Sequence, residues 1–220
     1  MDSMAILFDS KKCIGCRACQ VACKQWNDLD GEETNNRGSY ENPPDLSYCT
    51  WSKIEWREVE RNAKVEWLFT NRSCYHCTNA ACEESCPSDA IYHTPEGFVV
   101  INYDNCVGCG ICIDACPYDV PRLDERENVV KKCNGCFTRL EVSLIPACVK
   151  ACPTGALSYG DRNELLKLAE TYVAKLKDAG YSNACLYGAN EFDGLHFLSI
   201  LSDNPSLFGI RPRVPEVPQP

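Results

Sequence analysis

Residues 106–117 read Cys-Val-Gly-Cys-Gly-Ile-Cys-Ile-Asp-Ala-Cys-Pro, which is the spacing C-x2-C-x2-C-x3-C-P. Three cysteines two residues apart place their thiolates around one 4Fe–4S cube, and Gly108 and Gly110 let the backbone pass close to it. The fourth cysteine follows three residues later, where the chain should turn helical, so its thiolate faces away from that cube. Cys116 is therefore expected to complete a second cluster, built mainly by another copy of the motif.

The cysteines are too many and too regularly spaced to be ordinary core residues. The chain has 220 residues and 18 cysteines, of which sixteen fall into four groups: Cys13, Cys16, Cys19, Cys23; Cys74, Cys77, Cys82, Cys86; Cys106, Cys109, Cys112, Cys116; and Cys133, Cys136, Cys148, Cys152. Disulfides are a poor explanation, because the groups are ligand-like runs and no signal peptide is recognised. Zinc is the better alternative, but its sites usually use two C-x2-C pairs or include histidine. The pattern favours iron–sulfur clusters.

The spacing also predicts which cysteines share a cluster. The second and third groups are contiguous, so they should exchange their fourth cysteines. Their ligand sets are then Cys74, Cys77, Cys82 with Cys116, and Cys106, Cys109, Cys112 with Cys86. By analogy, the first and fourth groups combine across the chain into two more sets, Cys13, Cys16, Cys19 with Cys152, and Cys133, Cys136, Cys148 with Cys23. Four 4Fe–4S clusters are predicted. Cys49 and Cys185 stand alone and are interpreted as free thiols.

The charge of the chain restricts its partners. The formal net charge of −9 counts every cysteine as neutral. With sixteen thiolates and four oxidised cluster cores of about +2 each, the loaded protein carries about −17. This charge argues against nucleic acid or an anionic membrane as a partner and favours a cationic docking surface. No apolar run approaches the roughly 20 residues of a membrane-spanning helix, so the chain is expected to have no membrane span of its own.

The sequence predicts an α+β fold with two pseudo-symmetric 4Fe–4S modules. The order of residues 71–126, which is cluster loop, short hairpin and cluster loop, resembles a bacterial two-cluster ferredoxin, and this segment is the predicted inner module. Residues 1–26 and 127–160 are the predicted outer module. Residues 27–70 are interpreted as a long loop and an inserted β-hairpin, and residues 161–220 as a C-terminal helix and an extended tail.

Local patterns place the elements inside these segments. Strands are expected at 5–9 and 156–159, and hairpins from 51–60 with 65–70 and from 90–92 with 98–101. Asp161 followed by Glu164 predicts a helix start, and Gly180 ends the helix after about Asp178. The predicted apolar face of that helix consists of Leu165, Leu168, Ala169, Tyr172, Val173 and Leu176. His76, inside the second group, is interpreted as a hydrogen-bond donor near the cluster or as an exposed side chain, since four cysteines already suffice as ligands.

Nothing in the chain is typical of a catalytic site. It has no Gly-rich nucleotide loop, no nucleophile next to a base and no open metal site. Four closely spaced one-electron centres instead indicate electron transfer, and the chain is expected to be non-catalytic by itself. An electron carrier of this kind requires a partner that performs the chemistry.

Five stretches resemble a known family more specifically than the cysteines do: QVACKQWN (Gln20–Asn27), EETNNRGSYENPPDLSY (Glu32–Tyr48), VEWLF (Val65–Phe69), CPYDVPR (Cys116–Arg122) and IPACVKACPTGAL (Ile145–Leu157). Together they are similar to the iron–sulfur (beta or small) subunit of soluble tungsten- or molybdenum-dependent formate dehydrogenases, within the electron-transfer subunits of bis-pterin oxidoreductases. The likeness covers about residues 5 to 205. The loop Glu32–Tyr48 is its specific part, because the whole superfamily shares the cysteine pattern.

The resemblance implies partners that this chain does not contain. A large catalytic subunit would oxidise formate or reduce carbon dioxide at a bis-pterin tungsten or molybdenum centre, and that cofactor would belong to the partner alone. This chain would form a heterodimer or its multiples with that subunit and carry electrons to a cytochrome or another soluble acceptor. Relatives are often exported folded on the signal of the large subunit, which makes the periplasm the expected location and the cytoplasm the alternative.

Three other interpretations stay open at this point. The chain could be the equivalent subunit of another molybdenum or tungsten bis-pterin oxidoreductase, acting on a sulfur compound or an aldehyde. A free polyferredoxin predicts a stable monomer, and the long loop and the tryptophan-rich hairpin argue against it. A zinc-stapled binding module predicts a colourless protein.

Overall fold

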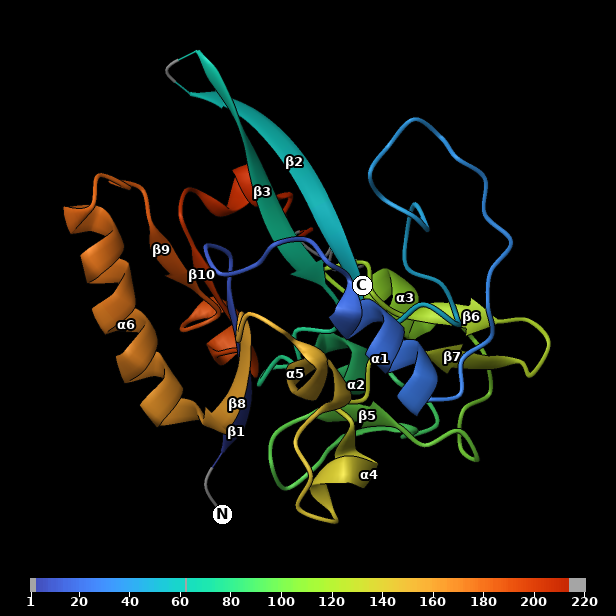
Figure 1. Cartoon of the computed structure of the whole chain (residues 1–220). Helices are drawn as coiled ribbons and strands as arrows, with labels where there is room; N and C mark the ends of the chain where they lie inside the picture. The colour runs from blue at the N-terminus through green and yellow to red at the C-terminus, as the bar shows by residue number, and fades with distance from the viewer. Residues whose placement is uncertain (1–2, 62, 214–220) are drawn as a thin grey trace.

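The computed structural model describes residues 3–61 and 63–213, so the expected C-terminal tail lies outside the described residues from position 214 onward. The fold is mixed, as expected, with short helices and four small sheets (Figure 1). The helices are α1 (Ala18–Trp26), α2 (Ala81–Glu84), α3 (Ile111–Ala115), α4 (Phe137–Leu140), α5 (Ala147–Ala151), α6 (Arg162–Asp178) and the 3-10 helices η1 (Glu191–Asp193) and η2 (Pro205–Phe208). The strands are β1 (Met4–Asp9), β2 (Lys53–Arg61), β3 (Lys64–Arg72), β4 (Ile91–His93), β5 (Val99–Ile101), β6 (Arg122–Asp124), β7 (Val129–Lys131), β8 (Leu157–Asp161), β9 (Cys185–Tyr187) and β10 (Phe197–Leu201).

The largest sheet joins the two ends of the chain. Its strand order is β8-β1-β10-β9, with β1 parallel to β10 and antiparallel to β8. Both β1 and β10 are buried along nearly their whole length, because each face of this sheet is covered. Side chains alternate between the faces of a strand, so Ile6 points to the cluster-bearing half of the molecule and Leu7 to the helix on the other side.

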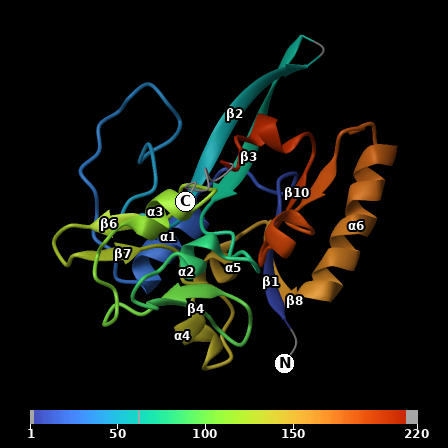
Figure 2. The same cartoon turned by 180° about the vertical axis from the view of Figure 1, so that it is seen from behind.

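Helix α6 covers the outer face of this sheet (Figures 1 and 2). It begins as predicted, with Oδ1 of Asp161 accepting a hydrogen bond from the backbone N–H of Glu164 at 2.9 Å. Four of the six predicted apolar positions are buried against the sheet: Leu165, Ala169, Val173 and Leu176. Leu168 was wrongly placed on that face, since its side chain is 59% exposed. Its position one residue before Ala169 rotates it by about 100° around the helix axis.

The hairpin β2–β3 projects from the body of the protein, as both views show (Figures 1 and 2). Its register pairs Trp56 with Phe69, and its base packs into the core through Ile54 and Leu68. Beyond that base, the residues of β2 are exposed or half-buried, as in a two-stranded ribbon with no third strand to cover it.

A long segment without regular structure precedes the hairpin and loops away from the body, where Figure 1 shows it at the right in blue. The buried side chain of Lys53 holds the middle of this segment against the hairpin. Nζ of Lys53 lies 2.6 Å from Oε2 of Glu41 and 2.7 Å from the carbonyl oxygen of Pro44, while Oε1 of Glu41 accepts from the backbone N–H of Trp56 at 2.9 Å.

The four cysteine groups lie on loops and short helices next to two small hairpins, β4–β5 and β6–β7. Helix α1 of the first group packs against α5 of the fourth, and α2 of the second group packs against α3 of the third. The chain therefore crosses over itself to bring its first and fourth groups together. None of the helices among the described residues has the length and apolar character needed to cross a membrane.

Candidate iron–sulfur cluster sites

The second and third cysteine groups enclose two separate cavities, and each group contributes one cysteine to the cavity of the other. Cys116 joins the second group around the first cavity, whose lining cysteines are Cys74, Cys77, Cys82 and Cys116. Cys86 joins the third group around the second cavity, whose lining cysteines are Cys86, Cys106, Cys109 and Cys112. These are the quartets that the motif spacing predicts.

The first and fourth groups cross over in the same way. Cys23 leaves its own group and lines a cavity with Cys133, Cys136 and Cys148. Cys152 stands beside the remaining members of the first group: burial, followed by the neighbouring charges of Cys152 and Cys16, raises the pKa of Cys13 to about 11. Three quartets thus line cavities, each with three cysteines from one group and one from another, and the effect of the Cys152 charge on Cys13 and Cys19 is consistent with a fourth.

Most of these thiols have raised pKa values, so a positively charged metal core is needed to stabilise their thiolate forms. Burial, together with the charges of neighbouring cysteines, raises the pKa of Cys19, Cys112 and Cys133 to about 12. Four thiolates can share such a site only when a positive core neutralises them, and metal coordination deprotonates thiols outright. The donor set therefore fits a 4Fe–4S core, which supplies that charge. No three His, Cys, Asp or Glu side chains of residues 3–61 and 63–213 converge closely enough to hold a single metal ion.

Hydrogen-bond donors point at the sulfur atoms. The backbone N–H groups of His76, Ala90 and Val130 lie 3.4 Å from the Sγ atoms of Cys74, Cys86 and Cys106, respectively. Side-chain amides of Asn71 and Asn27 add bonds of 3.6 Å to Cys19 and 3.7 Å to Cys23. Donors to sulfur favour the thiolate and the reduced, more negative cluster.

The cysteines that cross over in the C-P motifs of the second and fourth groups have matching surroundings. Burial opposes ionisation of Cys86, but the backbone and hydroxyl of Ser88 and the N–H of Ala90 outweigh it and lower its pKa. At Cys152, burial is likewise outweighed by Leu157 and Thr154, so its pKa is also lowered. The same local arrangement therefore occurs in both halves of the molecule: a hydroxyl side chain two residues after the cysteine lowers the pKa of its thiol.

The quartets follow one another in a single order. The charge of Cys19 raises the pKa of Cys23 and of Cys148, which relates the first quartet to the one built by the fourth group. The charge of Cys74 raises the pKa of Cys133, and that of Cys112 raises the pKa of Cys82, which relates the remaining two quartets in turn. Cys16 and Cys109 are the exposed cysteines, and they belong to the two end quartets.

Several residues near the quartets could not be assigned from the sequence pattern. His76 is fully buried, so the exposed alternative for it is wrong, and its ring nitrogen Nδ1 accepts a hydrogen bond from the N–H of Val99 at 3.1 Å. At Gly108 the backbone has φ +68°, and a Cβ atom there would collide with the backbone oxygen of Asn128, so this glycine allows the loop to pass close to Asn128. Lys132 is buried against one quartet although lysine is usually exposed.

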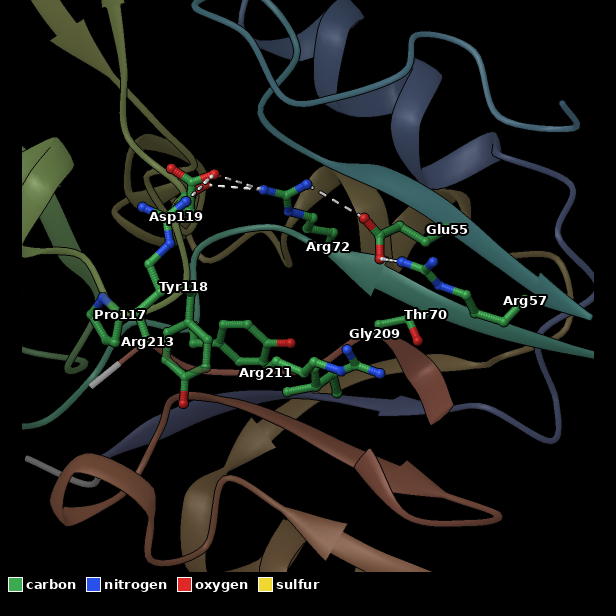
Figure 3. A pocket seen from close by; sticks show the side chains of 12 residues that line it. Glu55, Arg57, Thr70, Arg72, Pro117, Tyr118, Asp119, Gly209, Arg211 and Arg213 are labelled. Atoms are coloured by element: carbon green, nitrogen blue, oxygen red, sulfur yellow. Dashed lines mark hydrogen bonds and ion pairs between the residues drawn. The ribbon is translucent and has the colours of Figure 1, made fainter. Parts of the chain in front are cut away.

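Another cavity lies away from the quartets and contains no cysteine in its lining. Figure 3 shows it between the hairpin, the loop after Cys116 and the C-terminal segment, with Arg72 placed between Glu55 and Asp119. Nη1 of Arg72 lies 3.5 Å from Glu55, and its Nη2 lies 3.4 Å from Asp119, while Arg57 approaches the other carboxylate oxygen of Glu55 at 3.4 Å. The pair of Arg72 with Asp119 joins the hairpin to the loop after Cys116, whereas the two pairs made by Glu55 lie within the hairpin.

Comparisons with known proteins agree with this arrangement. Two domain families, each described as "4Fe-4S dicluster domain", match residues 12–90 and 65–162. The chain is 44% identical over 217 residues to the protein named "Formate dehydrogenase, nitrate-inducible, iron-sulfur subunit" of Escherichia coli, covering 97% of this chain and 74% of that one. It is 34% identical to "Formate dehydrogenase subunit beta" of Megalodesulfovibrio gigas, covering 94% of this chain and 97% of that one. It is 35% identical to "Formate dehydrogenase 2 subunit beta (cytochrome c-553)" of Nitratidesulfovibrio vulgaris, covering 79% and 83%.

Two dicluster domains require four 4Fe–4S clusters, and sixteen cysteines in four quartets match that number. A chain so similar to these relatives along almost its whole length shares their fold and their role in electron transfer. The protein belongs to the family of formate dehydrogenase iron–sulfur subunits.

Proposed function

We propose that this chain carries electrons between a formate-oxidising metal–pterin subunit and an electron acceptor. The observation that supports it most strongly is the single order of the four quartets, with an exposed cysteine at each end. A chain of clusters that carries electrons between two proteins needs an accessible cluster at each end and clusters shielded from water between them. The quartets containing Cys133 and Cys74 are in the middle, where the cysteines are buried or half-buried.

The sixteen grouped cysteines are the proposed ligands. The four sets are Cys13, Cys16, Cys19 with Cys152; Cys133, Cys136, Cys148 with Cys23; Cys74, Cys77, Cys82 with Cys116; and Cys106, Cys109, Cys112 with Cys86. When bound, the clusters supply one-electron chemistry. The role of the chain is to fix the distance between neighbouring sites, to exclude water from the middle ones and to donate hydrogen bonds to their sulfur atoms.

We further propose a heterodimer, or a multiple of it, with the catalytic subunit that holds the bis-pterin tungsten or molybdenum. Relatives named as formate dehydrogenase subunits support this partner, and the name of one relative includes cytochrome c-553, which supports a cytochrome as acceptor. The periplasm is the proposed location, by export together with the large subunit.

The decisive experiment uses the complex purified natively and without oxygen. Formate is added, and the absorbance of the clusters and their low-temperature EPR spectra are followed. Bleaching accompanied by reduced-cluster signals from four clusters is the expected result. If dithionite reduces all four clusters while formate reduces none, the formate assignment is wrong, and a different bis-pterin enzyme or a free polyferredoxin role replaces it. A free polyferredoxin would also elute as a monomer.

A further inference from the structure

Lys132 is a buried lysine at the junction of two quartets. It follows strand β7 directly and precedes Cys133, and only 3% of it is exposed. Its side chain lines the cavity of the quartet Cys74, Cys77, Cys82 and Cys116. Its neighbour Cys133 belongs to the adjacent quartet. Because its Nζ also donates to the carbonyl oxygen of Cys133, the ammonium lies at the junction of the two proposed cluster sites.

The hydrogen bonds of Lys132 hold its side chain in that place. Nζ donates to the carbonyl oxygen of Val99, at the start of β5, and to the carbonyl oxygen of Cys133 at 3.2 Å. Both acceptors are neutral backbone groups. Among the residues that the structure describes, no carboxylate pairs with this ammonium at hydrogen-bond or ion-pair distance. Lys53, which is also buried, has Glu41 at 2.6 Å.

A buried ammonium without a carboxylate needs negative charge from another source, because removing it from water costs several kcal/mol. Lys132 lines the cavity of Cys74, Cys77, Cys82 and Cys116, and its Nζ donates to the backbone of Cys133, which belongs to the next quartet. Each loaded 4Fe–4S site carries about −2, so the counter-charge of Lys132 is the two clusters themselves.

We propose that Lys132 is a positioning cation shared by the two middle clusters, and that its fixed charge raises the reduction potentials of both relative to the end clusters. A reduced cluster is one unit more negative than an oxidised one, so a cation at this place stabilises the reduced form. The cation lowers the cost of placing an electron on either middle site. This inference rests on the proposed ligand sets, but it does not depend on formate as the substrate.

The test is a redox titration of the natively purified complex, with chemical mediators and dithionite, in which EPR monitors the reduction of each cluster. Lys132→Met removes the charge and keeps the apolar stem. Lys132→Arg keeps the charge. Lys131→Met is the matched control, because it removes a neighbouring charge that is already paired with Asp124 at 2.9 Å and Glu127 at 2.6 Å.

For Lys132→Met we expect two of the four midpoint potentials to become more negative, each by about a tenfold change in the reduction equilibrium, or about 59 mV for one electron. The other two should stay in place. Lys132→Arg should titrate close to the wild type, and Lys131→Met should leave all four potentials unchanged. Unchanged potentials in Lys132→Met, a uniform shift of all four, or an equal shift in Lys131→Met would overturn the proposal.

Cluster loading separates charge from packing if the methionine variant assembles poorly. Iron per chain is measured first for Lys132→Met, for a second neutral variant, Lys132→Gln, and for Lys132→Arg. Loss of two clusters in both neutral variants but not in the arginine variant supports the proposal, because the sites then require the charge to form. Loss in all three variants overturns it. Since the titration uses chemical reductant, its result stands whether or not formate reduces the clusters, so a failed formate assignment is recognised separately.

Discussion

The indole of Trp56 occupies the space in which a side chain on Gly15 would have to stand. A Cβ atom on Gly15 would lie 2.6 Å from Cζ2 of Trp56 and 2.9 Å from Cε1 of Phe69, and the backbone there has φ +67°. Both rings belong to the projecting hairpin, so the hairpin packs directly on the loop that carries Cys13 and Cys16. The loop and the hairpin are therefore parts of one packed unit.

We expect Gly15→Ala to destabilise this unit by about 1–3 kcal/mol, from overpacking and from a strained backbone. The midpoint of thermal unfolding, followed by circular dichroism on the complex, should fall, and iron per chain should drop toward three clusters. Gly31→Ala is the control, because a Cβ on Gly31 would meet no atom within 4 Å. Equal stability and full iron in Gly15→Ala would contradict the packing described here.

A second prediction concerns the buried pair of Lys53 and Glu41. Lys53→Met leaves the Glu41 carboxylate without its cation in a mostly buried place, and breaking a buried pair costs about 3–5 kcal/mol. Because the same lysine holds the carbonyl of Pro44, the segment 27–50 should also loosen. Limited proteolysis should cut that segment faster in Lys53→Met than in Lys64→Met, which changes an exposed lysine at the hairpin tip. Identical cleavage rates would show that the pair does not hold the segment.

A third prediction separates ligands from lone thiols. Cys106→Ser is expected to lower the iron content of the complex by about one cluster in four, since a hydroxyl replaces one proposed ligand. Cys49→Ser should keep full iron, because Cys49 lies outside the four groups and its buried Sγ is 3.6 Å from the hydroxyl of Ser47. Loss of a cluster in Cys49→Ser would overturn the ligand assignment.

A fourth prediction tests the crossover itself. Cys74→Ser and Cys116→Ser lie in different sequence groups but line one cavity, so each should alter or remove the same EPR signal. Cys112→Ser is in the same sequence group as Cys116 and lines another cavity, so it should affect a different signal. If Cys116→Ser instead changed the same signal as Cys112→Ser, the quartets would follow sequence groups and the exchange would be wrong.

The sequence predicted the elements that depend on local spacing. Both hairpins and the start of α6 at Asp161 follow from patterns a few residues long, in which the turn or the cap dictates the geometry. The ligand sets and the crossing of the inner quartets, which the three-residue offset of Cys116 predicts, stay predictions.

The rest of the fold depends on pairing between distant residues. Residues 195–201 appear in the sequence as a short apolar run interrupted by His196 and Ser199, yet they supply β10, the parallel neighbour of β1. His196 is buried there, and the hydrogen bond between its Nδ1 and the carbonyl oxygen of Met4, at 2.7 Å, satisfies the ring nitrogen. The burial of Lys132 could not be predicted for the same reason. A lysine before a cysteine is usually a surface charge, and here cysteines distant in the sequence bury it.

The position of β1 between β8 and β10 has a consequence for the order in which the molecule is made. Both neighbours of β1 come much later in the chain, so β1 has two unpaired edges until residues 157–201 have been synthesised. All cysteines of the inner quartets lie at or before residue 116, and the other residues that line their cavities lie at or before Lys132, whereas the outer quartets need Cys148 and Cys152. Maturation should therefore proceed from the interior of the sequence outward, with the two ends of the chain closing last.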